Sequence, residues 1–303
     1  MSKLFDFIII GAMKSGTTTL HDLLSNDKRI ALPVNKEAPY FTSEAEMALG
    51  FDAFIKKYYV NTDGKIIGKV TPHYMLWAED AVKNISLTSA DSKIIAILRD
   101  PIDRLVSHYS MCVGLGLEKR DINEAIENCL GGSDDCELTP TNSYIACSEY
   151  GRILAQYYET FDKANILVLN FNQLIEDKSL LIQQIYKHID LEVDSSIGSG
   201  AARSMSRGGK GKKYRQLMYS FCARNRAFIL PFVPRKQRLA LRFKFTEMRA
   251  EAFSPNFKVG DIRQDIADRL RKHFEEGARS LSRRGLNPYW IEDGNYPIGQ
   301  VFS

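Results

Sequence analysis

Apolar segments of five or six residues recur along the chain, separated by longer stretches in which apolar residues return at helical spacing. The segments rich in Ile, Val and Leu lie at 5–10, 66–70, 93–98 and 165–169. Short runs of this kind predict strands that are buried on both faces. Strands that alternate with helices predict an α/β fold in three layers, with a central parallel sheet flanked by helices.

The clearest helix signal follows the segment 93–98. Asp100 suits the N-cap, and Pro101 suits the first helical position because the missing N–H is not needed there. A last helix is expected after Asp261, which we interpret as its cap, with Gln264 completing a capping box. The other helix predictions rest on spacing alone and cover the segments that begin at Thr17 and those at 144–161, 179–189 and 217–229.

Charge is unevenly distributed along a chain whose composition is ordinary for a globular protein. The 303 residues are 44% hydrophobic and 26% charged, and we expect a single domain over 1–303. The segment 203–249 holds 14 basic residues and one acid, although the whole chain carries a net charge of only +4. We interpret 203–255 as a basic loop and helical insertion that faces an anionic glycan, a membrane surface or solvent alone.

Two features bear on the compartment in which the protein works. No apolar run is long enough for a membrane span or for the core of a signal sequence. The five cysteines include no C-x-x-C pair, which favours reduced thiols over a disulfide framework or a zinc site. The sequence therefore predicts a cytoplasmic protein.

A glycine-containing loop joins the first predicted strand to the first predicted helix. In Gly11-Ala-Met-Lys-Ser-Gly-Thr-Thr18, successive backbone N–H groups and a helix N-terminus form a cradle for an anion. Lys14 adds a mobile positive charge, and the hydroxyls of Ser15, Thr17 and Thr18 add donors. The loop therefore predicts a phosphate-binding site.

This loop differs from the Walker A loop of nucleoside triphosphatases. The Walker pattern places lysine directly after the second glycine, whereas Thr17 stands there and Lys14 lies inside the loop. A triphosphatase also needs an acidic magnesium ligand at the end of a neighbouring strand, and the residue that follows 93–98 is the cation Arg99. Both differences argue against a small-molecule kinase that uses ATP and magnesium, which is one alternative function.

The motifs GAMKSGTTTL, from Gly11, and ILRDPIDRLVSHY, from Ile97, resemble those of sulfotransferases that use PAPS (3'-phosphoadenosine 5'-phosphosulfate). The resemblance is strongest to the carbohydrate branch, which includes the heparan sulfate enzymes, and it covers residues 5–213 and 261–290. It implies a P-loop-like fold, PAPS as the sulfuryl donor, PAP as the product and no metal. The expected acceptor is a hydroxyl group of a carbohydrate, and no nucleic acid partner is expected.

The resemblance also implies binding roles for particular residues. The loop residues that resemble a 5'-phosphosulfate site are Lys14, Ser15, Gly16, Thr17 and Thr18. Arg99 and Ser107 resemble the ligands of the 3'-phosphate, which suits arginine because a guanidinium group matches phosphate oxygens. A basic, glycine-bearing loop that closes over the donor is expected at Lys210, Gly211 and Lys212.

Catalysis is assigned by the same resemblance to Lys14 and Glu37. Lys14 neutralises charge on the bridging oxygen as its bond to sulfur breaks, and Glu37 accepts the proton of the attacking hydroxyl. His73 is an alternative base. The family often has a lysine where Val70 stands, and Lys69, one residue earlier, is expected on the opposite face of the strand. The second alternative function is a non-catalytic protein that binds an anion or a membrane.

Overall fold

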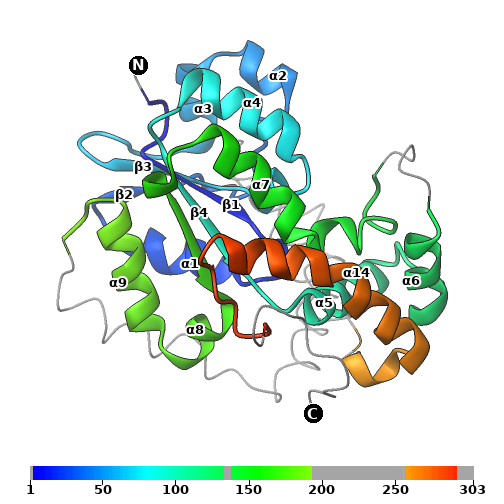
Figure 1. The fold of residues 1–303 in the computed structure, drawn as a ribbon. Helices are drawn as coiled ribbons and strands as arrows, with labels where there is room; N and C mark the ends of the chain where they lie inside the picture. Colours follow the sequence, from blue (N-terminus) through cyan, green and yellow to red (C-terminus); the bar gives the residue numbers. More distant parts are fainter. Residues whose placement is uncertain (1–2, 133–137, 193–254, 256, 292–303) are drawn as a thin grey trace.

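The computed structural model describes residues 3–132, 138–192, 255 and 257–291 (Figure 1). The helical insertion expected at 203–255 therefore lies, apart from its last position, outside the described residues. Within the described ranges, no helix combines the length and the apolar character that a membrane crossing requires.

Five parallel strands form the central sheet, in the order β2-β3-β1-β4-β5 (Figure 1). They are β1 (Phe7–Gly11), β2 (Ile30–Ala31), β3 (Ile66–Val70), β4 (Lys93–Leu98) and β5 (Ile166–Asn170). The four strands predicted from the sequence are confirmed, whereas β2 is too short to leave a pattern. Because all strands are parallel, the loops that follow them gather at one edge of the sheet, where ligands bind in folds of this class.

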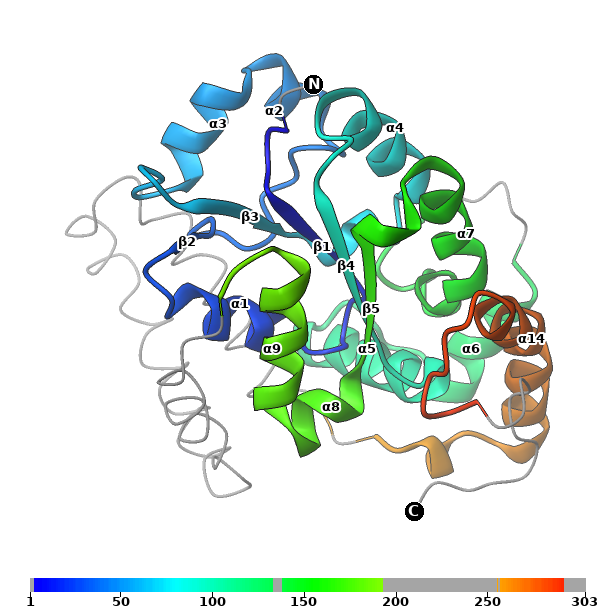
Figure 2. The ribbon, with the colours of Figure 1, turned by 60° about the vertical axis from the view of Figure 1, so that its left-hand side comes forward.

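Alternate residues of the strands face opposite sides of the sheet and build two separate cores. In β4, Ile94, Ala96 and Leu98 face one core, and Ile95 and Ile97 face the other. Helices that contribute to the first core include α4 (Ala78–Thr88), α5 (Pro101–Leu115), α7 (Tyr150–Thr160) and α14 (Gln264–Arg283). Helices of the second are α1 (Thr17–Ser25), α8 (Phe171–Glu176) and α9 (Lys178–His188). Figure 2 shows the sheet between these two sets, which confirms the three-layer prediction.

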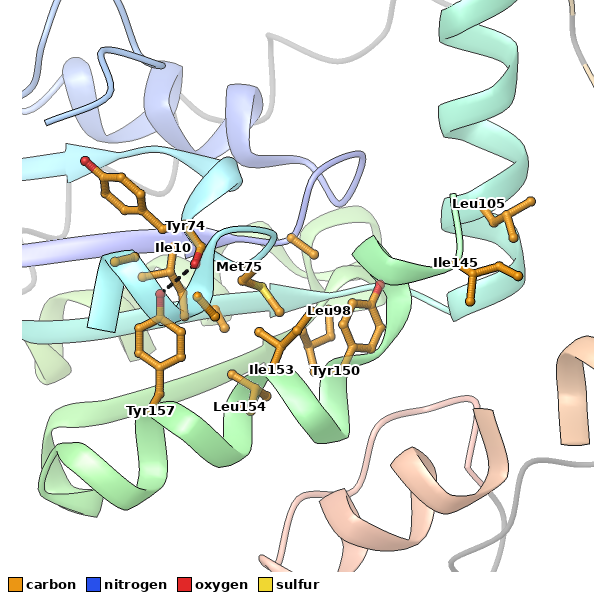
Figure 3. Close-up of a cluster of buried hydrophobic side chains, with 14 of the residues drawn as sticks. Ile10, Tyr74, Met75, Leu98, Leu105, Ile145, Tyr150, Ile153, Leu154 and Tyr157 are labelled. Carbon is orange, nitrogen blue, oxygen red and sulfur yellow. Dashed lines mark hydrogen bonds between the residues drawn. The ribbon is translucent and has the colours of Figure 1, made fainter. Parts of the chain in front are cut away.

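The first core joins the segment after β3 to α7 (Figure 3). Ile153 and Leu154 of α7 are buried beside Met75, and the Tyr157 hydroxyl donates a hydrogen bond to the Tyr74 carbonyl at 2.8 Å. The remaining described elements are α2 (Glu44–Ala48), α3 (Phe51–Tyr58), α6 (Ile122–Leu130), and the 3-10 turns η1 (Pro72–Tyr74), η2 (Ala146–Ser148), η3 (Lys163–Asn165) and η5 (Val259–Asp261).

The helix predicted over 144–161 begins six residues later than expected. Tyr144 precedes the turn η2, and α7 starts at Tyr150. The reason is a contact from another element, because the Tyr144 carbonyl accepts a hydrogen bond from the buried side chain of Arg104. The Ser148 N–H, four residues further on, donates to the Ile145 carbonyl at 2.7 Å, so the Tyr144 carbonyl accepts no helical hydrogen bond.

The cap predicted for the last helix is also wrong. Asp261 ends the turn η5, and its carboxylate accepts a hydrogen bond from the Lys258 backbone N–H at 2.7 Å. The helix α14 begins at Gln264, after Arg263, and has no side-chain cap. The apolar stripe of this helix, in contrast, is buried as expected.

A pair of glycines lets α14 cross α7 at close range. A Cβ atom on Gly151 would lie 2.6 Å from the Cα atom of Gly277, so the two helices touch backbone to backbone. The chain that follows α14 then returns to the carboxyl edge of the sheet. There Trp290 packs on Tyr150, with ring centroids 6.0 Å apart.

Candidate active site

The loop between β1 and α1 forms one wall of a site at the carboxyl edge of the sheet. Gly16, the N-cap of α1, has a φ of 86°, and a Cβ atom there would collide with Leu174 of α8, so only glycine suits this position. Lys14 has a φ of 66°, which is also left-handed. A left-handed lysine costs on the order of 1–3 kcal/mol, and such strain is concentrated at ligand-binding sites.

Two hydroxyl groups meet behind this loop. Ser15 is fully buried, and Tyr150, the first residue of α7, is buried beside it. Burial raises the pKa of the Tyr150 hydroxyl, and smaller opposing contributions come from Arg104, from the side chain of Ser15 and from the backbone of Arg99. Tyr150 therefore lies beside both the loop after β1 and Arg99, the residue after β4, although its hydroxyl makes no hydrogen bond of good geometry with either.

Arg99 follows β4 and forms a second wall. Its guanidinium carbon lies 5.0 Å from the centroid of the Phe171 ring, and its Nη2 atom is 3.9 Å from the nearest paired carboxylate, that of Asp103. Asp100 instead caps α5, as predicted, and accepts hydrogen bonds from two backbone N–H groups of the first turn. The described residues therefore neutralise the positive charge of Arg99 only weakly, through this one long ion pair.

Four buried polar atoms around these walls have no hydrogen-bond partner in the described chain. They are Ser15 Oγ, Arg99 Nε, His108 Nε2 and the Tyr150 hydroxyl oxygen, and we call these four residues the site cluster. Only two further atoms of this kind occur among the described residues. Buried polar groups in folded proteins are nearly always paired, so this concentration indicates that the partners come from a ligand.

Glu37, the candidate base, lies between β2 and α2. Its Oε1 atom is 2.7 Å from Lys36 Nζ. Burial acts to raise the pKa of Glu37, but Lys36, His73 and Lys69 together outweigh it, and the pKa lies below its ordinary value. The carboxylate is therefore ionised at neutral pH, which a proton acceptor requires.

Lys69 and Thr71 of the β3 end hold the backbone that carries Glu37. Their side chains donate to the Lys36 carbonyl at 3.3 and 3.5 Å. Val70 faces the opposite core, as the one-residue offset predicted. Lys69 is fully buried, and burial lowers its pKa well below the ordinary value, although Glu37 opposes this shift. The lysine thus lies on the Glu37 side of the strand.

The binding residues expected in the first half of the chain lie at this carboxyl edge. Thr17 is buried and Thr18 is half-buried on the first turn of α1. Ser107 is half-buried on α5, and its hydroxyl makes no hydrogen bond within the described chain. The expected closing loop at Lys210, Gly211 and Lys212 lies outside the described residues.

Three residues of the site were not found from the sequence. Tyr150 and His108 belong to the site cluster, and Lys69 supports the Glu37 backbone. The only local signal was that Arg104 and His108 are four residues apart on α5 and therefore share a helix face. The positions of Tyr150 and Lys69 depend on contacts between distant elements.

A family model described as the sulfotransferase domain matches residues 4–216, which is most of the chain. The chain belongs to the sulfotransferase domain family. Its curated relatives include the membrane-associated sulfotransferase kil1 of Dictyostelium discoideum, 36% identical over 111 residues, and human heparan sulfate glucosamine 3-O-sulfotransferase 3B1, 29% identical over 172 residues. These matches cover 36% and 56% of this sulfotransferase chain, but only 23% and 42% of the relatives.

A solved sulfotransferase from Alicyclobacillus acidocaldarius has a similar fold. It superposes with a TM-score of 0.54 over 79% of this chain and 96% of its own, at 19% sequence identity. The likeness concerns the fold and confirms the P-loop-like arrangement of the sulfotransferase domain. In the described residues no group of three or more His, Cys, Asp or Glu side chains could hold a metal ion.

Proposed function

We propose that this sulfotransferase domain moves the sulfuryl group of PAPS to a hydroxyl oxygen of an acceptor. One observation carries the proposal: four buried polar atoms without a partner in the described chain belong to the loop after β1, the residue after β4, and the helices α5 and α7, and the same loop contains a lysine in a left-handed conformation. The hydroxyl, guanidinium and imidazole groups of this cluster can all donate hydrogen bonds. A ligand with several anionic oxygens would satisfy them together.

The residues present suit the donor that the family uses, which is PAPS. The backbone N–H groups of the loop, with Ser15 and Lys14, would hold the 5'-phosphosulfate. Arg99 and Ser107 would hold the 3'-phosphate, a group that ATP does not have. The bound donor supplies the sulfonyl group and a phosphate leaving group.

Two charged residues of the chain would act at the two ends of the transfer. Glu37 accepts the hydroxyl proton as the acceptor oxygen approaches sulfur, and Lys36 fixes one of its oxygens. Lys14, on the loop side, stabilises the negative charge that develops on the leaving phosphate. Transfers of this kind need the attacking and leaving oxygens in line, so the base would act on the attacking oxygen and the cation on the leaving oxygen.

For the acceptor we propose a carbohydrate hydroxyl. The support is the human relative, which is named a heparan sulfate glucosamine 3-O-sulfotransferase. The basic segment 203–249 would contact an anionic glycan or a membrane surface, and this proposal concerns residues outside the described part of the chain. The cytoplasmic location likewise stays a prediction.

The test is a transfer assay with radiolabelled PAPS and a panel of glycans, phenols and lipids. We expect label in a carbohydrate product, and we expect Arg99→Ala to reduce its formation. A parallel assay replaces PAPS with labelled ATP and magnesium. Transfer from ATP alone would support the kinase alternative, and binding of an anionic glycan or vesicle without any transfer would support the non-catalytic alternative.

A further inference from the structure

His108 is a buried histidine that the proposed transfer mechanism has not yet used. It lies on α5 with no exposed surface, and its ring packs edge to face on Tyr144 with centroids 4.8 Å apart. Its Nε2 atom has no partner in the described chain. A purely structural histidine in such a place would normally pair both ring nitrogens.

Arg104 determines which nitrogen of His108 carries the proton. Arg104 is fully buried, and its Nε atom and one terminal nitrogen donate to the Ser148 hydroxyl and the Tyr144 carbonyl. Its other terminal nitrogen lies 3.5 Å from His108 Nδ1. Because a guanidinium group can only donate, Nδ1 must accept, and a neutral imidazole then carries its hydrogen on Nε2. The unpaired atom is therefore a donor.

Among the described residues, no acidic group contributes to the electrostatic surroundings of His108. Burial lowers the pKa of His108 well below its ordinary value, and Arg104, Lys14 and His73 lower it further. The imidazole is therefore neutral at neutral pH. A buried N–H among cationic neighbours is best satisfied by an anionic oxygen.

The groups that act on the charge of His108 include residues of the candidate site. Lys14 of the loop is one of them. His73 acts on both His108 and the candidate base Glu37. The imidazole is therefore within electrostatic range of the loop that would hold the phosphate, and it shares the neighbour His73 with the candidate base.

We propose that the Nε2–H group of His108 donates a hydrogen bond to a non-bridging sulfonyl oxygen of bound PAPS, and that Arg104 is the positioning residue that orients the imidazole. This inference rests on the proposed function, because it requires PAPS at the loop. It assigns His108 to the transferred group itself, and not to the nucleotide. PAP, which has no sulfonyl group, would leave the Nε2–H group unpaired.

The comparison of PAPS with PAP therefore isolates the contact. The experiment measures Kd for both nucleotides by calorimetry without an acceptor, in the wild type, His108→Gln and His108→Phe. Glutamine keeps an N–H donor near the Nε2 position, whereas phenylalanine keeps a ring against Tyr144 and removes the donor. The matched control is His188→Phe, because His188 bonds to the Asn165 carbonyl near the opposite edge of the sheet.

We expect His108→Phe to weaken PAPS binding about tenfold, which corresponds to about 1.4 kcal/mol, with the Kd of PAP within about twofold of wild type. His108→Gln should stay close to the wild type for both nucleotides, as should His188→Phe. PAP binding shows that each variant is folded, and His108→Leu replaces the phenylalanine variant if that protein does not fold.

Three results would overturn the inference. An unchanged Kd of PAPS in His108→Phe would show that the proposed hydrogen bond does not form. Parallel weakening of PAPS and PAP would show that His108 only supports the nucleotide site. Equal losses in the glutamine and phenylalanine variants would show that ring shape matters and the donor does not. Failure of the proposed function is distinguishable, because the wild type itself would then bind neither PAPS nor PAP.

Discussion

Two buried polar regions of this domain differ in whether their polar atoms have hydrogen-bond partners within the described chain. In the first, which we call the Glu118 network (Glu118, Arg120 and Tyr144), the carboxylate is 3% exposed. It accepts hydrogen bonds from the Arg120 side chain at 2.7 and 3.0 Å, from the Tyr144 hydroxyl at 3.0 Å and from two backbone N–H groups. In the site cluster, each of the four residues has a buried polar atom without a partner in the described chain.

The difference separates polar groups that stabilise the fold from groups that bind a ligand. A buried donor without a partner costs about 1–3 kcal/mol, so the site cluster lowers the stability of the ligand-free protein. The two regions meet at Tyr144, whose hydroxyl belongs to the network, whose ring packs on His108 and whose carbonyl binds Arg104. The satisfied region thus supports the unsatisfied one.

The largest expected effect is a loss of turnover when a catalytic residue of the candidate site is replaced. Glu37→Gln keeps the shape of the side chain and removes the proton acceptor, so turnover should fall about 10²–10⁴-fold while the Kd of PAP stays close to wild type. Steady-state kinetics and calorimetry measure the two quantities. Lys14→Ala should reduce both. If Glu37→Gln keeps full activity and His73→Ala does not, the imidazole is the base.

The corresponding change in the Glu118 network should act on stability. Glu118→Gln removes the charge that Arg120 and Tyr144 share, and we expect a loss of about 1–3 kcal/mol in the free energy of unfolding. Chemical denaturation measures this loss. The Kd of PAP should stay within about threefold of wild type. A variant that is as stable as wild type but binds PAP poorly would reverse the roles of the two regions.

The stability difference between wild type and Glu118→Gln should depend on pH. Burial acts to raise the pKa of Glu118, but hydrogen bonds from Arg120 outweigh it and lower the pKa to about 2, against about 4.3 in an unfolded chain. A depressed pKa contributes stability above the unfolded value and loses it as pH falls towards the folded value. The gap in Tm should therefore be full at pH 6–7 and shrink progressively below about pH 5. A gap that is constant down to about pH 3 would contradict this assignment.

The smallest effect on stability is expected in the site cluster. Ser15→Ala and Tyr150→Phe remove hydroxyl groups that make no hydrogen bond within the described part of the chain, so Tm without ligand should stay constant or rise slightly. The increase in Tm that PAP causes should become smaller in both variants. Thermal unfolding with and without PAP measures both effects. A loss without ligand as large as that of Glu118→Gln would show that these hydroxyl groups stabilise the fold.

Local sequence signals were sufficient for the frame of the fold. The strands β1, β3, β4 and β5 were predictable because buried parallel strands are uniformly apolar, and the Asp100 cap was predictable because its partners are the next residues along the chain. The start of α7 was not, because Arg104 from α5 binds the Tyr144 carbonyl. Asp261 was expected to cap the last helix, but its carboxylate accepts from the nearby Lys258 N–H, a local competition that spacing alone does not resolve.

The site divides in the same way. The loop and Arg99 were predictable because each directly follows a strand, and all strand ends of a parallel sheet meet at one edge. Lys69 and Tyr150 were not, because the first reaches the Glu37 segment and the second the loop only through the tertiary fold. The role proposed for His108 was not predictable either, because it depends on the contact of its ring with the buried side chain of Arg104.

The central claim is that the site cluster and its loop bind a nucleotide with a 3'-phosphate. The most direct test is calorimetric titration of the wild type and Arg99→Ala with PAP and with 5'-AMP, which differ only in that phosphate. We predict that the wild type binds PAP at least about tenfold more tightly than 5'-AMP, and that Arg99→Ala abolishes the difference. Equal binding of the two nucleotides by the wild type would contradict the account.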